Sequence, residues 1–115
     1  MDKSVSGATL DDVPLLNTVL RSPYLTAQNK AVLGLVLMRY YNFGHDLPVS
    51  ITDEEFARVT QSGSRAEAVI YRRWCEQSRL LNRVELEGEN HFSPNYFGIK
   101  EFLRYHKENH PNGKV

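Results

Sequence analysis

The sequence has little of several features that mark other classes of protein. Its one cysteine, Cys75, cannot form an internal disulfide bridge. No apolar run approaches the roughly 20 residues that cross a bilayer, and the first twelve residues hold no apolar core like that of a signal peptide. We therefore expect a cytoplasmic protein with no membrane anchor. Its 115 residues suffice for one domain that removes roughly 65% of its unfolded surface from water.

Groups suited to catalysis or metal binding are equally sparse. His106 and His110 have the spacing of two metal ligands on a helix, but a proline follows and the sequence shows no third ligand. Cys75 has no histidine at a spacing that would activate it as a nucleophile. A glycine-rich loop for phosphate is also missing. We expect no catalytic residue, no metal ion and no cofactor, and hence a protein that is not an enzyme.

The formal net charge is zero, but the charges are sorted along the chain. Residues 61–83 hold five arginines and two glutamates, a net charge of +3. Residues 45–60 hold four acidic residues and one arginine, a net charge of −3. A neutral protein sorted in this way can present one basic face. Its long-range attraction to phosphate is weaker than that of a basic domain.

The middle of the chain predicts a buried helix followed by a short strand and a second helix. Thr26 is a suitable N-cap for a segment that is apolar almost all round from Ala31 and ends near Gly44. A strand is expected over residues 47–51. Thr52 and Glu55 then form a capping box that opens the second helix, whose inward side chains are predicted to be Phe56 and Val59.

A tight turn, a third helix and a hairpin follow. Gly63 is expected to supply the backbone freedom of the turn, and Ser64 to cap a helix that reaches about Leu81. Val84 and Leu86 alternate with charged residues and predict a strand, with a turn at residues 88–90 and a return strand at residues 91–93. Short helices are expected at residues 13–20 and 96–105.

This order of elements predicts a fold that is mainly α with a small β wing, a winged helix-turn-helix with extra short helices at both ends. The domain is expected to span residues 13–105. Residues 1–12 are predicted to be a flexible N-terminal segment, and residues 106–115 a flexible tail or linker.

The third helix is expected to carry the binding surface. Its core side is predicted to hold Ala66, Ile70, Tyr71, Trp74 and Leu81, and its outward side Arg65, Ala68, Val69, Arg72 and Arg73. A guanidinium group offers two parallel donors that match guanine or phosphate, so this side can contact base edges and the DNA backbone. The alternative is a solvated basic face with no partner.

Further candidate contacts lie at the two ends of this helix. The free N–H groups and positive dipole end at its start suit a phosphate, with help from Gln61, Ser62 and Ser64. Their alternative role is to shape the turn and cap the helix. Arg83 can reach phosphate from the base of the wing, whereas Arg79 is assigned to the helix dipole. Asn90 and His91, at or beside the wing tip, can enter a minor groove or can belong to an ordinary hairpin turn.

The sequence also resembles the N-terminal DNA-binding domain of phage replication initiators of the lambda O type, over residues 13–102. That family typically has a proline in an amphipathic start, a helix opened by L-T-x-x-Q, an aromatic-glycine end, a helix-turn-helix and a wing closed by Asn-Tyr before an aromatic residue. The corresponding pieces here are Val13-Pro14, Leu25-Thr26-Ala27-Gln28, Tyr41 to Gly44, EEFARVTQSGS, Ser93-Pro94-Asn95-Tyr96 and Phe102.

Two features depart from the family pattern. Gln61 stands where the family usually has a glycine after the threonine of the turn, and the wing is acidic at Glu85, Glu87 and Glu89. The family's region for recruiting the helicase machinery has no counterpart in this sequence. The chain is thus either a fragment of a longer initiator or a stand-alone protein with the same module.

The resemblance implies sequence-specific binding to double-stranded DNA at repeated sites of a replication origin, in a phage-like or mobile-element initiator. It also implies several copies side by side or a homodimer, and contact with the replication machinery through a missing C-terminal region. Two alternatives stay open. One is a transcriptional regulator of a phage or plasmid operon. The other, favoured by zero net charge and the acidic wing, is a winged-helix protein-interaction module without DNA binding.

Overall fold

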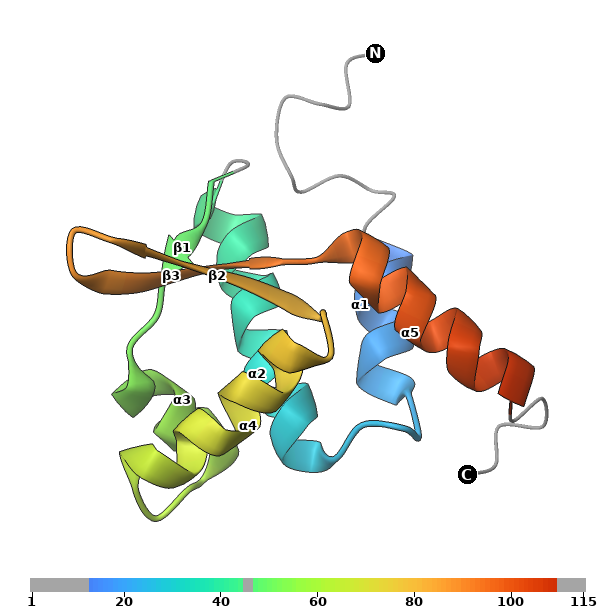
Figure 1. Ribbon diagram of the computed structural model, residues 1–115, viewed down its shortest axis with the longest axis horizontal. Coiled ribbons are helices and arrows are strands. Elements are labelled where there is room, and N and C mark those ends of the chain that lie inside the picture. Colours follow the sequence, from blue (N-terminus) through green and yellow to red (C-terminus); the bar gives the residue numbers. More distant parts are fainter. Residues whose placement is uncertain (1–12, 45–46, 110–115) are drawn as a thin grey trace.

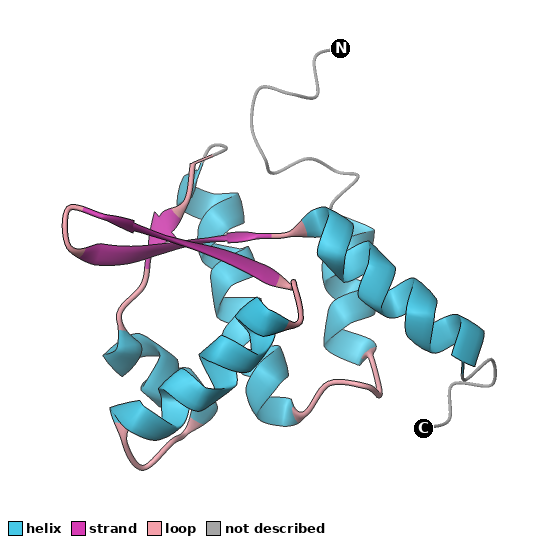
Figure 2. Ribbon diagram, in the orientation of Figure 1, coloured by secondary structure: helices cyan, strands magenta, loops and turns pink. Residues whose placement is uncertain are grey.

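The computed structural model describes residues 13–44 and 47–109 (Figure 1). These residues form five α-helices, one π-helical turn and a small antiparallel sheet with strand order β1-β3-β2 (Figure 2). The mainly helical fold with a small sheet is confirmed. The elements are α1 (Val13–Arg21), α2 (Ala27–Arg39), η1 (Tyr40–Gly44), β1 (Val49–Ser50), α3 (Asp53–Thr60), α4 (Arg65–Gln77), β2 (Leu81–Leu86), β3 (Glu89–Pro94) and α5 (Tyr96–Asn109).

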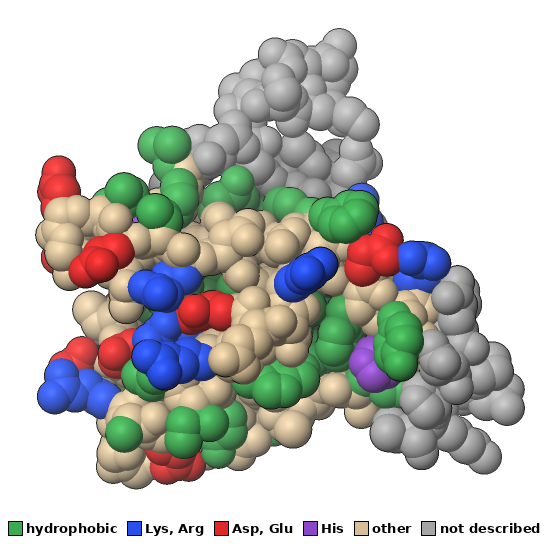
Figure 3. Space-filling model, viewed as in Figure 1, with side chains coloured by type: hydrophobic (Ala, Val, Ile, Leu, Met, Phe, Trp, Pro, Cys, Tyr) green, Lys and Arg blue, Asp and Glu red, His purple; other side chains and the backbone are tan. Residues whose placement is uncertain are grey.

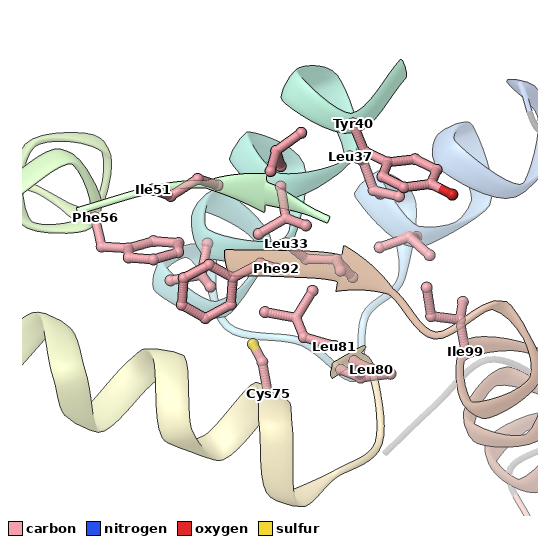
Figure 4. Packing of buried hydrophobic residues seen from close by; sticks show 14 of the residues in the cluster. Leu33, Leu37, Tyr40, Ile51, Phe56, Cys75, Leu80, Leu81, Phe92 and Ile99 are labelled. Atoms are coloured by element: carbon pink, nitrogen blue, oxygen red, sulfur yellow. The ribbon is translucent and has the colours of Figure 1, made fainter. Parts of the chain in front are cut away.

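Helix α2 is the centre of the hydrophobic core, as its sequence predicts. Its N-cap is Thr26, whose hydroxyl oxygen accepts a hydrogen bond of 3.1 Å from the backbone N–H of Asn29. Four apolar side chains of α2 are fully buried. They pack in one core cluster with residues from the other helices and from the sheet (Figure 4). Among these, the rings of Phe56 from α3 and Phe92 from β3 meet edge to face with their centroids 5.1 Å apart.

Helix α3 begins with the expected capping box. The backbone N–H of Thr52 donates to Glu55 Oε1 at 2.9 Å, and the backbone N–H of Glu55 donates to Thr52 Oγ1 at 3.1 Å. Phe56 is fully buried as predicted. Val59 is 39% exposed, so its expected inward position is wrong.

The turn between α3 and α4 uses a different residue from the one predicted. Gln61 adopts the left-handed conformation with φ of 55°, and its N–H caps α3 by donating to the carbonyls of Ala57 and Arg58. Gly63 does not need a positive φ here. Ser64 caps α4 as expected, with its hydroxyl accepting from the backbone N–H of Glu67 at 3.2 Å.

Helix α4 ends at Gln77, before the predicted end at about Leu81, because Arg79 takes a left-handed conformation with φ of 64°. The hairpin that follows turns at Glu87 and Gly88, whose φ values are 52° and 81°. Two successive positive values are typical of the two-residue turns that match the twist of a hairpin. The predicted turn at residues 88–90 is therefore wrong, and Asn90 and His91 lie within β3.

Helix α5 begins in close contact with the backbone between α4 and β2. The backbone N–H of Asn95 donates to the carbonyl of Leu80 at 3.0 Å, and Asn95 Oδ1 accepts from Gly98 N–H at 2.9 Å. A Cβ at Gly98 would lie 1.8 Å from the carbonyl oxygen of Arg79, so only glycine fits. Helix α5 continues to Asn109, past its predicted end, so residues 106–109 of the predicted flexible tail are helical. The expected flexible residues 1–12 and 110–115 lie outside the described residues.

Candidate nucleic-acid interface

The buried side of α4 is not the side that the sequence pattern predicts. Ala68 and Cys75 are fully buried and Arg72 is only 6% exposed, and these three residues share one side of the helix. The Cys75 thiol donates a hydrogen bond of 3.8 Å to the carbonyl of Asn29 in α2. The expectation that Ala68 and Arg72 face outward is therefore wrong.

The large apolar residues of α4 lie on the exposed side instead. Ile70 is 66% exposed, Trp74 is 37% exposed, and Ala66 is also exposed, so their expected core position is wrong. Tyr71 is partly buried against the core, and Leu81 is buried, but in β2. Small side chains on the inner side allow α4 to approach α2 closely, and this close packing takes precedence over burial of the largest residues.

Arg72 joins α4 to α3 and to the wing through the protein's own acidic residues. Its NH1 atom lies 2.5 Å from Glu76 Oε2, and its Nε atom lies 3.4 Å from Asp53 Oδ1 without a hydrogen bond. Arg83 donates through Nε to Glu76 Oε1 at 3.2 Å and through NH1 to Asn90 Oδ1 at 3.0 Å. Both guanidinium groups thus neutralise carboxylates within the fold, which makes them poor candidates for phosphate.

Two arginines of α4 have the exposure expected for them. The side chain of Arg65 is 68% exposed and donates to Glu54 Oε2 at 2.9 Å. Such a surface pair contributes about 0–1 kcal/mol, so a phosphate can replace the carboxylate at little cost. Arg73 is exposed, and its guanidinium forms no ion pair or hydrogen bond with the rest of the described chain.

Arg58 is a further basic candidate that sequence reasoning missed. It is exposed on α3, one turn after Glu54, and therefore on the side of α3 that meets Arg65 of α4. It forms no ion pair within the described ranges. Its position among four acidic residues hid it in the sequence, because the local charge sum of residues 45–60 is negative.

The turn before α4 already uses most of its hydrogen-bonding groups. Ser62 Oγ lies 2.5 Å from Thr60 Oγ1, and Ser64 caps the helix. Glu67 Oε1 accepts from the backbone N–H of Gly63 at 3.1 Å, so a carboxylate occupies the helix start where a phosphate was expected. The Gln61 side chain is exposed and forms no hydrogen bond with the described residues. The turn therefore offers Gln61 to a partner, while Ser62 and Ser64 have structural roles.

The wing offers little to DNA. Asn90 accepts a hydrogen bond from Arg83, and His91 Nδ1 lies 3.1 Å from the carbonyl of Glu89 on the outer side of the sheet. Of the two expected positions, the one at the wing tip is wrong, because Glu87 and Gly88 form the turn and Asn90 and His91 lie beside it in β3. Exposed carboxylates surround that tip.

The residues that remain available lie together on one surface, which we call the outer face of α4. Its members are exposed or partly exposed and share one side of the helix: Arg65, Ala66, Val69, Ile70, Arg73 and Gln77. Hydrophobic, basic and acidic side chains alternate over this side of the molecule, so the surface is not a continuous basic patch (Figure 3).

Three other features of the described residues concern the cysteine, metal ligands and membrane-spanning helices. Burial raises the pKa of the Cys75 thiol to about 12, which keeps it protonated and unreactive. No three histidine, cysteine, aspartate or glutamate side chains come together as metal ligands in the described part of the chain. No helix there is long and apolar enough to cross a membrane. His106 stacks on Tyr24 with ring centroids 4.3 Å apart, and His110 lies outside the described residues.

We compared the chain with known protein families, curated proteins and solved structures. No family model, no curated protein and no solved structure matches the chain.

Proposed function

We propose that this protein binds double-stranded DNA as a winged helix-turn-helix, with the outer face of α4 in the major groove. Helices α3 and α4 and the turn between them supply the helix-turn-helix, and β2 and β3 supply the wing. One observation carries the proposal: α4 packs on α2 and α3 with one side and leaves the other side exposed from Arg65 to Gln77. A helix exposed along one whole side is the shape that fits a major groove.

The chemistry of this face supports a particular kind of contact. Arg73, Arg65 and Arg58 supply up to three phosphate contacts, so the affinity should fall with salt with a logarithmic slope of about −3. Ile70, Ala66 and Val69 are apolar, and apolar side chains recognise the methyl group of thymine. We expect a site with thymine in the major groove, and weaker electrostatic binding than that of a basic domain.

The biological setting is proposed from the resemblance to lambda O-type initiators. In that setting the protein recognises repeated sites at a replication origin of a phage-like or mobile element. Regulation of a phage or plasmid operon would use the same DNA-binding surface. A genomic footprint of the bound protein separates the two, because an initiator occupies repeats at an origin and a regulator occupies a promoter.

A protein-interaction module without DNA binding is the second candidate, and specific observations favour it. Arg72 and Arg83 are neutralised inside the fold, and Ile70 and Trp74 are exposed apolar side chains of a kind that protein partners bury. Absence of binding to any duplex at low salt, where the electrostatic attraction is largest, would favour this function.

The test combines selection of a binding site with a matched pair of variants. Duplexes are selected from a random pool at low salt, and the affinity of the selected duplex is measured by fluorescence anisotropy over a series of salt concentrations. Arg73→Ala should weaken binding and make the salt slope shallower by about 1, because one phosphate contact is lost. Arg21→Ala, which removes an exposed arginine at the end of α1, should change neither. Equal affinities and slopes for Arg73→Ala and the unmodified protein would contradict the proposal.

A further inference from the structure

The tip of the wing exposes apolar side chains among uncompensated negative charges. Val84 and Leu86 lie on the outer side of the sheet and are 41% and 44% exposed. Glu89 pairs across the hairpin with Leu86 on this side, Glu87 lies in the turn, and Glu85 lies on the other side of β2. None of the three forms an ion pair with a described residue. We call these five residues the wing tip. A phosphate backbone would repel this surface, so the wing tip suits a partner that is apolar and basic.

A groove with the complementary character lies between α5 and the α4–β2 turn. It has a volume of about 410 Å³ and is lined by aromatic side chains, of which Phe97 is 73% and Tyr105 is 60% exposed. Phe102 lies deeper and contacts Trp74 edge to face. Arg79 also lines the groove, and its guanidinium forms no ion pair or hydrogen bond with the described residues, whereas Glu101 is paired with Arg104. The groove is therefore aromatic with one free positive charge.

We propose that the wing tip of one copy of this protein docks into the groove of a second copy. Val84 and Leu86 would contact Phe97 and Tyr105, and the wing-tip carboxylates would face Arg79. Apolar contact supplies the attraction and the opposite charges supply the orientation. This inference concerns surfaces other than the outer face of α4 and does not depend on DNA binding.

The positions of the two surfaces determine the type of assembly. In Figure 1 the turn of the wing and helix α5 lie at opposite ends of the molecule, so one copy cannot satisfy its own groove. A single such contact joins unlike surfaces head to tail and leaves a free wing tip at one end and a free groove at the other, to which further copies can add. Such a contact builds short chains of copies rather than a closed symmetric dimer.

The contact should be weak in solution because a hairpin tip and one groove bury less surface than a stable interface of about 1,200–2,000 Å². We expect association that grows with concentration and weakens with added salt, since salt screens the contact between the glutamates and Arg79. Copies held close together by another means would associate more strongly through their higher effective concentration.

The experiment uses two variants that each destroy one of the surfaces. Leu86→Glu alters the wing tip and Phe97→Glu alters the groove, and both positions are exposed enough to accept the change without unfolding. Val84→Glu and Arg79→Glu are second variants of the same two surfaces. The mass distribution is measured by sedimentation velocity without DNA and at low salt, from about 10 µM to about 1 mM, which covers the dissociation constants of weak contacts. Far-ultraviolet circular dichroism confirms folding of each variant.

We expect the unmodified protein to form species beyond a dimer as its concentration rises, and each variant alone to associate at least tenfold more weakly. An equimolar mixture of Leu86→Glu and Phe97→Glu should form dimers that grow no further. In that mixture the intact wing tip of one variant meets the intact groove of the other, while the two altered surfaces repel each other. A contact between the wing tip and the groove gives this result, whereas a contact between two like surfaces does not.

Matched controls carry the same change on exposed side chains outside both surfaces. Met38→Glu and Leu47→Glu should associate like the unmodified protein, since these residues are 60% and 67% exposed and belong to neither surface. The proposal is overturned if the unmodified protein stays monomeric, if it forms only a closed dimer, or if the variants associate as it does. It is also overturned if the mixture of the two variants stays monomeric.

Discussion

Arg72 lies over the ring of Phe92, with its guanidinium carbon 5.6 Å from the ring centroid and the carboxylates of Asp53 and Glu76 beside it. The most central arginine of α4 is therefore part of the fold. Its charge stabilises the junction of α3, α4 and the sheet, and DNA binding must depend on the arginines that remain exposed.

Arg72→Ala should destabilise the protein by about 2–4 kcal/mol, because it leaves the partly buried Asp53 without a cation and Glu76 with Arg83 alone. Arg72→Met keeps most of the apolar volume but not the charge, so the difference between the two variants separates packing from charge. Chemical denaturation at neutral pH measures both. A change below about 0.5 kcal/mol for Arg72→Ala, as expected for a surface residue, would contradict the structural role.

Glu55 makes the stability depend on pH in the acid range. Hydrogen bonding to Arg39, whose NH2 atom lies 2.7 Å away, and to the backbone of Thr52 lowers the pKa of Glu55 from 4.5 to about 2. The folded state therefore holds the ionised form more strongly than the unfolded state does. This stabilisation is fully present above about pH 4.5 and is lost as the pH falls towards 2.

Glu55→Gln should cost about 1–2 kcal/mol at pH 7, a value reduced for the partial exposure of the ion pair. Glutamine can still accept the hydrogen bond from Thr52, so the loss reports mainly on the pair with Arg39. Unfolding free energies of both proteins between pH 7 and pH 2.5 should converge as the pH falls. A difference that stays constant over this range would show that the ionised form of Glu55 has no special role.

Gly98 should tolerate no side chain. Gly98→Ala places a Cβ against the carbonyl oxygen of Arg79 and should destabilise the protein by about 2–3 kcal/mol or displace the start of α5. Gly63→Ala is the matched control, because its Cβ would meet nothing closer than Glu67 Oε1 at 3.8 Å. Thermal unfolding of both variants tests this contact, and equal midpoints would argue against it.

Local sequence rules predicted those parts of the fold that depend on neighbouring residues. Thr26, Thr52 and Ser64 cap the helices assigned to them, because a cap requires only a side-chain oxygen and the next turn of backbone. The order of helices and strands followed from the same signals. The turn residues were less predictable, since Gln61 and Glu87 adopt a backbone conformation that glycine or asparagine usually takes.

The orientation of α4 was not predictable from hydrophobic periodicity. The pattern placed Ile70 and Trp74 in the core, but the helix packs through Ala68 and Cys75, whose small size permits close approach to α2. Burial of Arg72 depends on Asp53 from another helix, and no local pattern reports such a partner. Arg72 and Ala68 were therefore assigned to the wrong side of α4. The expected exposure of Arg73 was correct.

The central claim, that the outer face of α4 contacts duplex DNA, is tested most directly at Ile70. Because this side chain is 66% exposed, Ile70→Glu should leave the unfolding midpoint nearly unchanged while placing a negative charge in the middle of the face. The variant should bind the selected duplex at least tenfold more weakly, since a carboxylate repels phosphate, whereas Met38→Glu should bind normally. Unchanged affinity of a folded Ile70→Glu variant would contradict the account.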